Sequence, residues 1–147
     1  MVHAAQYANE DGQLDSYVFW DALEKAYGFD RTTLTEVPFT IDLEGVNSIP
    51  YLFGDLTSLK KAPKLDLDGV RDLTGLFSFC ESLAEVPDLH VDGELYMQGI
   101  FLGCASLKDG SVRIILGDNA RVADDRDMIQ RSGLTRVPFY DRAGNPV

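Results

Sequence analysis

The residues that could perform chemistry are few and widely spaced. The only histidines are His3 and His90, and the chain has no nucleophile elbow, phosphate-binding glycine loop or H-E-x-x-H motif. Ser58, Ser82 and Ser106 recur at one spacing, where hydrogen bonding within turns explains them better than nucleophilic catalysis does. Because no nucleophile stands beside a base, we expect no enzymatic activity and no cofactor.

Mostly acidic side chains recur every 24 residues in two columns. One column comprises Glu44, Asp68 and Asp92, and the other comprises Asp42, Asp66 and His90. Carboxylates stacked at the spacing of neighbouring strands repel one another unless they are solvated or neutralised. We expect ordinary solvation and no metal site. The alternative is a Ca²⁺ ion on Glu44, Asp68 and Asp92, because Ca²⁺ prefers carboxylate oxygens.

The two cysteines, Cys80 and Cys104, share the same 24-residue spacing. Stacked strands would place them roughly 5 Å apart, a separation that permits a disulfide. Because Leu56 occupies the same column, we expect two buried thiols in an apolar core instead. Two cysteines are also too few for a structural zinc site.

These spacings belong to an internal repeat of 24 residues, whose copies align without gaps at 52–59, 76–83 and 100–107. A divergent fourth copy follows, in which Met128 stands where the repeat has phenylalanine. The aligned apolar residues predict the structural core. They are Phe53, Phe77, Phe101, Leu59, Leu83, Leu107, Leu65, Leu89, Cys80 and Cys104.

Each copy predicts a strand followed by a tighter coil. In the segment 64–68 two leucines alternate with polar residues, which is the period of a half-buried strand. Gly69 then turns the chain, and Leu73, Leu76 and Phe77 fall on one helical face. A single copy cannot bury these side chains, so the fold needs several stacked copies.

The stretch 77–87 reads Phe-x-x-Cys-x-Ser-Leu-x-x-x-Pro, which resembles the BspA-type leucine-rich repeats of bacterial surface proteins and phage virion proteins. The resemblance covers roughly residues 34–140, and the third copy departs from it at Ser111. It implies an α/β repeat fold, a short leucine-rich-repeat-like solenoid with 24-residue repeats. It also implies a binding surface and no catalytic role.

The residues before the repeat predict an N-terminal helical cap, domain 1–33, on a repeat domain 34–147 whose last repeat is degenerate. A helix is expected over 13–27, with Asp15 or Ser16 capping its start and Gly28 ending it. Its predicted apolar face comprises Leu14, Tyr17, Val18, Leu23 and Tyr27. Phe19 and Trp20 cannot both lie on that face, so Trp20 is a candidate partner contact. A helix that docks on a partner is the alternative to a cap.

The charge of the chain further limits the classes of partner that it can bind. Acidic residues number 24 against 13 basic ones, and the net charge of −11 disfavours binding to nucleic acid or to anionic lipid. No apolar run approaches membrane-spanning length, and the first residues predict no signal peptide. Arginines gather after residue 107 and predict a partner-binding end, with a solvated mixed-charge repeat as the alternative. They are Arg113, Arg121, Arg126, Arg131, Arg136 and Arg142.

These observations predict a non-enzymatic protein-binding or structural module. The resemblance makes a phage virion accessory protein the leading prediction, either a capsid decoration or a minor tail protein. Its partners would be capsid or tail proteins, or copies of itself. The alternatives are a bacterial surface adhesin module and an acidic inhibitor that mimics nucleic acid. Those alternatives would place the chain on the cell surface or in the cytoplasm.

Overall fold

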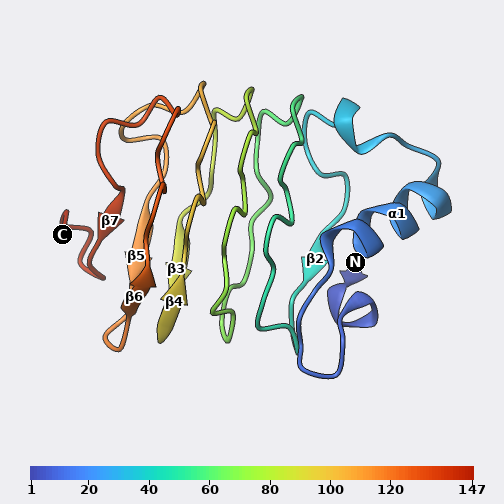
Figure 1. The fold of residues 1–147 in the computed structure, drawn as a ribbon, viewed down its shortest axis with the longest axis horizontal. Helices are drawn as coiled ribbons and strands as arrows, with labels where there is room; N and C mark the ends of the chain where they lie inside the picture. Colours follow the sequence, from blue (N-terminus) through green and yellow to red (C-terminus); the bar gives the residue numbers. More distant parts are fainter.

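The computed structural model describes all residues from Met1 to Val147. Figure 1 shows a row of side-by-side coils that begins beside helix α1 and ends at strand β7. The elements, in chain order, are β1 (Val2–His3), the 3-10 helix η1 (Ala4–Tyr7), α1 (Ser16–Tyr27), the 3-10 helix η2 (Arg31–Thr33), β2 (Ile41–Asp42), β3 (Leu89–Val91), β4 (Glu94–Tyr96), β5 (Ile114–Leu116), β6 (Arg121–Asp124) and β7 (Phe139–Tyr140).

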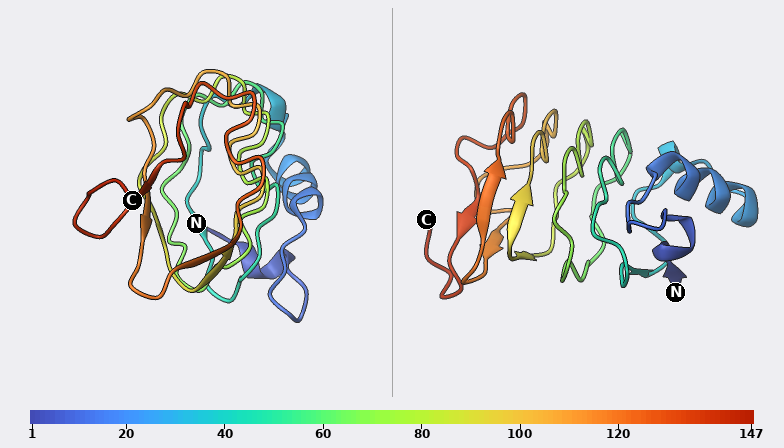
Figure 2. Two further views of the ribbon diagram at one scale, coloured as in Figure 1. Left: turned by 60° about the vertical axis from the view of Figure 1, so that its left-hand side comes forward. Right: turned by 60° about the horizontal axis from the view of Figure 1, so that its bottom comes forward.

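The strands form three small parallel sheets, with the orders β1-β2, β3-β5-β7 and β4-β6. In the three-stranded sheet His90 lies opposite Ile115, and Ile115 lies opposite Tyr140. Seen from near the end of the row, the coils overlap in one outline, and α1 lies outside it (Figure 2). Each coil therefore runs in the same direction as its neighbours.

The 24-residue period of the sequence is the spacing at which backbone groups join neighbouring coils. Parallel bridges connect Ser48 with Asp72, and Asp72 with Tyr96. Between the same coils the N–H of Phe77 donates to the carbonyl of Ile100 at 2.9 Å. Repeats of one length thus keep equivalent backbone groups in register.

The predicted fold class is wrong. The α/β repeat, in the form of a leucine-rich-repeat-like solenoid with a helical cap, is replaced by small parallel sheets and one α-helix, and no repeat contains a helix. At the predicted helical face, Leu73 and Phe77 donate their N–H groups to the next coil and not to the preceding helical turn. Gly75 lies between them with φ 61°, a left-handed conformation that an α-helix does not contain.

The strand predicted at 64–68 does not form either. Only one backbone group of this segment takes part in a backbone hydrogen bond. The carbonyl of Leu67 accepts from the N–H of Val70, which lies outside the segment, at 3.0 Å. The N–H of Asp68 donates instead to Oδ1 of Asp66 at 3.0 Å. β2 and β3 belong to separate sheets. No backbone hydrogen bond joins either of these strands to the segment 64–68.

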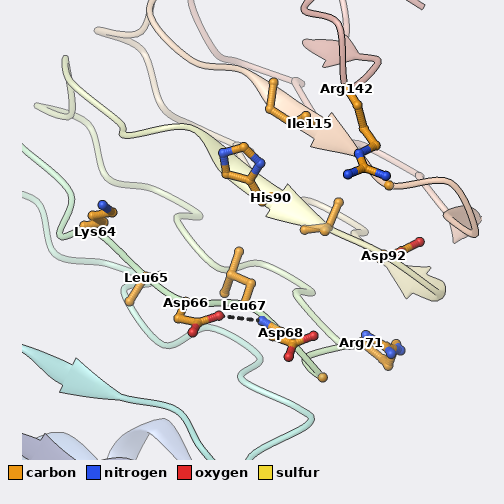
Figure 3. Close-up of a pocket in the computed structure, with 13 residues that line it drawn as sticks. Lys64, Leu65, Asp66, Leu67, Asp68, Arg71, His90, Asp92, Ile115 and Arg142 are labelled. Carbon is orange, nitrogen blue, oxygen red and sulfur yellow. Dashed lines mark hydrogen bonds between the residues drawn. The ribbon is translucent and has the colours of Figure 1, made fainter.

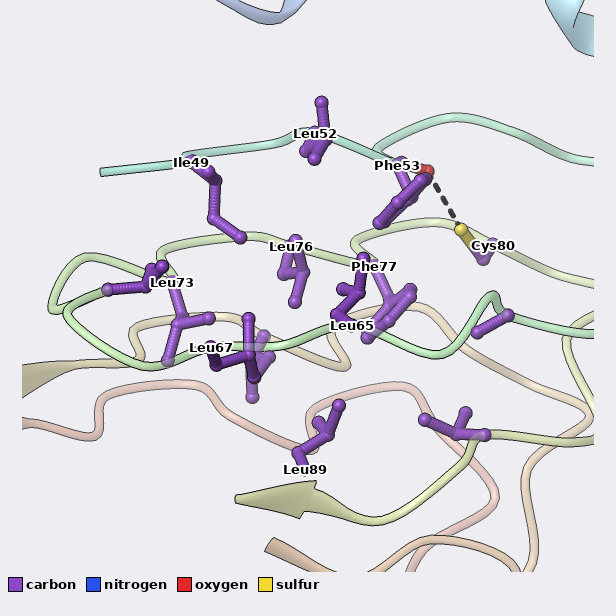
Figure 4. Close-up of a cluster of buried hydrophobic side chains, with 14 of the residues drawn as sticks. Ile49, Leu52, Phe53, Leu65, Leu67, Leu73, Leu76, Phe77, Cys80 and Leu89 are labelled. Carbon is purple, nitrogen blue, oxygen red and sulfur yellow. Dashed lines mark hydrogen bonds between the residues drawn. The ribbon is translucent and has the colours of Figure 1, made fainter. Parts of the chain in front are cut away.

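The interior is one continuous apolar cluster, part of which is drawn in Figure 4. All ten residues predicted as core are buried, and Leu65 is the most exposed of them at 8%. The rings of Phe53, Phe77 and Phe101 stack, with centroids 5.5 and 5.8 Å apart. Each ring thereby covers a face of the next, which explains why a single copy could not bury its own phenylalanine.

The divergent fourth copy is displaced by one residue from its predicted alignment. The N–H of Phe101 donates to the carbonyl of Met128, as the N–H of Phe77 donates to the carbonyl of Ile100. Met128 therefore continues the column of Ile100, and Ile129 takes the place of the phenylalanine. The prediction that Met128 replaces the phenylalanine is wrong, because the extra length of this copy is absorbed before Met128.

Helix α1 begins after Asp15, whose carboxylate accepts hydrogen bonds from the N–H groups of the first turn, and it ends at Gly28 with φ 71°. Much of its predicted apolar face is exposed: Tyr17, Val18 and Tyr27. The side chains that it buries are Phe19, Trp20 and Leu23. These three belong to the same cluster as the repeat phenylalanines, on both sides of the predicted domain boundary at residue 33.

Candidate functional site

The predicted acidic columns line a hollow of about 530 Å³ beside β3 and β5 (Figure 3). The charged and polar side chains of this strand-side hollow are Lys64, Asp66, Asp68, Arg71, His90, Asp92 and Arg142. The structure therefore brings Asp68 and Asp92 together with one predicted partner-binding arginine. Glu44 lies outside this hollow and lines another one, with Asp42 and Asp68, next to β2.

Several carboxylates of the acidic columns accept hydrogen bonds from backbone N–H groups. Oδ1 of Asp42 accepts from the N–H of Glu44, and Oδ1 of Asp66 accepts from the N–H of Asp68, both at 3.0 Å. Asp92 accepts from two backbone N–H groups at 2.9 Å. No group of three or more His, Cys, Asp or Glu side chains is placed to hold a metal ion. The structure therefore gives no support to the alternative of a cation on Glu44, Asp68 and Asp92, and of these three carboxylates only that of Asp92 accepts backbone hydrogen bonds.

The predicted partner-binding arginines are largely engaged within the chain. Five form ion pairs: Arg113 with Asp88, Arg121 with Glu94, Arg126 with Asp124, Arg136 with Asp109, and Arg142 with Asp118. Four of these pairs join acids of the preceding coil. The neighbouring carboxylates raise the pKa of Arg113 and of Arg126. Arg131 is exposed and has no such pair. Four of these ion pairs thus lie between neighbouring coils, and the paired arginine side chains remain exposed.

Trp20, the other predicted partner contact, is not at the surface. Its side chain is 2% exposed, and its Nε1–H donates to the carbonyl of Leu52 at 2.5 Å. The rings of Phe19 and Phe53 lie 5.2 and 6.3 Å from the indole, centroid to centroid. The prediction of an exposed partner contact is therefore wrong: Trp20 joins the helix to the first coil, although it is among the residues that line a hollow beside α1.

Both cysteines are buried free thiols. Sγ of Cys80 lies 2.9 Å from the carbonyl of Phe53, and Sγ of Cys104 lies 2.9 Å from the carbonyl of Phe77, so each thiol can donate to the preceding coil. Burial raises the pKa of both thiols, to about 12 for Cys104. Since the thiolate is the reactive form, these groups are poor nucleophiles at neutral pH.

A feature that the sequence analysis missed is a hollow of about 690 Å³ between α1 and the neighbouring turns. Its wall carries three exposed aromatic side chains, Tyr17, Tyr51 and Phe79, which are 72%, 54% and 37% exposed. A smaller hollow of about 200 Å³ adjoins it, since both are lined by Tyr51, Ser78 and Phe79. We call the two hollows the aromatic groove.

Backbone conformation sets the position of two of these aromatic residues. Tyr51 and Phe79 have φ of 58° and 59°, a left-handed conformation that is uncommon for bulky residues. A Cβ atom added to Gly75 would collide with the ring of Tyr51, and one added to Gly103 would collide with the ring of Phe79. Each aromatic ring thus lies against a glycine of the next coil.

A sequence signal for these positions exists. Gly75 and Gly99 have left-handed φ and follow Tyr51 at the repeat spacing, and Gly103 follows Phe79 in the same way. An aromatic residue in a column of glycines marks an unusual backbone site. Glycine columns also occur in ordinary turns, so the spacing alone does not single out these positions.

The aromatic groove is acidic. Its charged side chains are Asp21, Arg31, Asp55 and Asp127. Arg31 is already engaged: its guanidinium pairs with Asp21, and also with Glu24 at 2.6 Å. Hydrogen bonds from Arg31 lower the pKa of Glu24. Asp55 and Asp127 are exposed and form no ion pair within the chain. The groove therefore presents aromatic rings and unneutralised carboxylates.

Comparisons of the chain with protein-family models, with curated proteins and with solved structures found no match. The resemblance to BspA-type repeats therefore rests on the sequence motif alone. In addition, the structure has no helix of the length and apolar character needed to cross a membrane.

Proposed function

We propose that this chain is a non-enzymatic protein-binding module, and that a segment of its partner docks in the aromatic groove. One observation carries the proposal: three exposed aromatic side chains converge on one groove, and strained backbone conformations hold two of them there. Exposed aromatic residues are typical anchors of protein interfaces. Backbone strain also clusters at functional sites more than elsewhere.

The chemistry of the groove supports binding over catalysis. Its polar side chains carry hydroxyls, carboxylates, the amide of Gln98 and one paired guanidinium, with no histidine or cysteine among them. The hydroxyl of Thr32 donates to the carboxylate of Asp30 at 2.7 Å, and no histidine in the groove is available to activate Ser16 or Ser78 as a nucleophile. Such groups suit hydrogen bonding to a docked segment.

The experiment pans a displayed library of random peptides against the immobilised chain and measures the affinity of enriched peptides. Tyr51→Gly removes the aromatic ring and introduces the residue that the next coil has at this position, so we expect folding to survive. Loss of an interface anchor predicts affinity lower by roughly thirtyfold. The matched control is Tyr27→Ala, which removes an exposed tyrosine of α1 that does not line the groove.

Two results would contradict the proposal. Peptides that bind wild type and Tyr51→Gly equally would place binding elsewhere on the molecule. Enrichment of oligosaccharides and not peptides, in a parallel screen of a glycan panel, would make the groove a sugar-binding site. Circular dichroism and thermal unfolding of each variant would confirm that a lost affinity does not reflect a lost fold.

We also propose, from the repeat motif at 77–87, that the partner is a capsid or tail protein of a phage virion. Affinity capture from the native lysate, with identification by mass spectrometry, tests this with wild type and Tyr51→Gly side by side. Capsid or tail proteins recovered by wild type alone would support it. Recovery of a nuclease or polymerase by both would overturn it in favour of an inhibitor that mimics nucleic acid.

A further inference from the structure

We infer that the segment bound in the aromatic groove is basic, and that one lysine or arginine side chain lies between Tyr51 and Phe79 and pairs with Asp55. The inference rests on the proposed function, because it names the chemistry of the partner at the same site. It commits to a basic polypeptide segment as the occupant.

The backbone brings these three residues side by side. The N–H of Gly54 donates to the carbonyl of Tyr51 at 2.9 Å, so Tyr51 and Asp55 flank a single tight turn. The N–H of Asp55 donates to the carbonyl of Ser78 at 2.9 Å, which places Asp55 beside Phe79 of the next coil. The two aromatic residues and Asp55 accordingly line the same hollow.

That arrangement suits a cation. A lysine ammonium or an arginine guanidinium is attracted to the face of an aromatic ring, and this attraction increases as water is excluded. Both side chains also carry an apolar stem that can cover the rings while the charged head reaches a carboxylate. Tyr51 and Phe79 supply the rings, and Asp55 supplies the counter-charge.

Charge complementarity selects a basic partner over a neutral or acidic one. Asp21, Asp55 and Asp127 outnumber Arg31 in the groove, and Arg31 is occupied by Asp21 and Glu24. An acidic segment would be repelled. A neutral segment would remove water from Asp55 without supplying a partner for its charge, which opposes binding.

The whole chain strengthens this selection. Its net charge of −11 attracts basic segments over a long range and speeds their association at low ionic strength. Because exposed charges are screened by salt, binding of a basic segment should weaken as the ionic strength rises. Stacking of an uncharged sugar on the same rings would show no such dependence.

The test uses four synthetic peptides that differ only at one central residue: lysine, arginine, norleucine or glutamate. Isothermal titration calorimetry measures their binding to the full chain. We expect the lysine and arginine peptides to bind roughly tenfold more tightly than the norleucine peptide. Asp55→Asn should remove most of that preference and reduce its dependence on salt. Glu10→Gln, an exposed acid outside the groove, is the matched control and should change neither.

The outcomes separate the inference from the function on which it rests. Norleucine and lysine peptides that bind equally, both losing affinity in Tyr51→Gly, would overturn the inference and leave the groove a protein-binding site. A preference for lysine that survives Asp55→Asn would overturn the pairing with Asp55. If no peptide depends on Tyr51, or if only glycans do, the proposed function fails together with the inference.

Discussion

At the scale of single residues, the left-handed positions of the coils show how a side chain and its neighbour determine one another. Tyr51 and Gly75 occupy equivalent places in adjacent coils, yet they cannot be exchanged independently. The ring of Tyr51 fills the space beside Gly75 that a side chain would need. An aromatic residue in one coil therefore requires a glycine in the next.

This pairing predicts the effect of Gly75→Ala. Alanine at φ 61° is strained, and its Cβ would also collide with the ring of Tyr51, so unfolding should become easier by about 3 kcal/mol. Gly69→Ala is the matched control, because Gly69 has φ 80° with open space beside it, and its cost should be about 1 kcal/mol. Urea unfolding monitored by circular dichroism measures both values.

The double variant Tyr51→Gly/Gly75→Ala decides whether the ring is the cause. Removing the ring removes the collision, so the additional cost of Gly75→Ala should fall to that of Gly69→Ala. If Gly75→Ala costs the same with and without Tyr51, the stability loss comes from the backbone alone. The contact between the Tyr51 ring and residue 75 would then contribute nothing to the free energy of unfolding.

At the scale of elements, α1 shows how a local error in a sequence prediction propagates. The helix was expected over 13–27 with Asp15 or Ser16 as its cap and Gly28 at its end; Asp15 is the cap, Gly28 ends the helix, and the first helical residue is Ser16. The buried face carries Phe19, Trp20 and Leu23, whereas Tyr17, Val18 and Tyr27 of the predicted face are exposed. Apolar side chains all round the helix left the sequence pattern ambiguous, and only the position of the first coil decides between the faces.

The cap itself gives a prediction. Oδ1 of Asp15 accepts hydrogen bonds from the N–H groups of Tyr17 and Val18 at 2.9 and 3.2 Å. Asp15→Ala should therefore lower the free energy of unfolding by about 1 kcal/mol. Ser16→Ala, one residue further on, is the control and should be close to neutral. An equal loss in the two variants would show that the cap contributes nothing specific. Thermal unfolding of both variants makes the comparison.

At the scale of the whole molecule, the repeat predicts packing better than it predicts secondary structure. The stacked phenylalanines could be predicted because side chains in one column must meet when copies of equal length stack. The helical face at 73–77 was not predictable from spacing, because i, i+3, i+4 spacing also fits successive turns. The ion pairs of Arg113, Arg121, Arg136 and Arg142 could not be predicted from local spacing, because each carboxylate partner lies one coil earlier in the chain.

The candidate site, too, could be predicted only in part from the sequence. The acidic columns were visible in the sequence, and the structure places most of them along one side. The aromatic groove was not visible, because Tyr17 and Tyr51 come from parts of the chain that the repeat alignment treats separately. Only the packing of α1 against the first coil brings them together.

The break in pairing at 64–68 has a mechanical consequence. On the side of Asp72 the coils remain joined by backbone bridges, whereas β2 and β3 have no such connection to 64–68. The row of coils can therefore bend by opening on the side of 64–68, and the bridged side acts as the hinge of that motion. Amide hydrogen exchange should show it: the N–H groups of Leu65 and Asp66 should exchange fastest within the repeats, while that of Phe77 stays protected. Equal protection of these N–H groups from exchange would mean that the row of coils does not open on the side of 64–68.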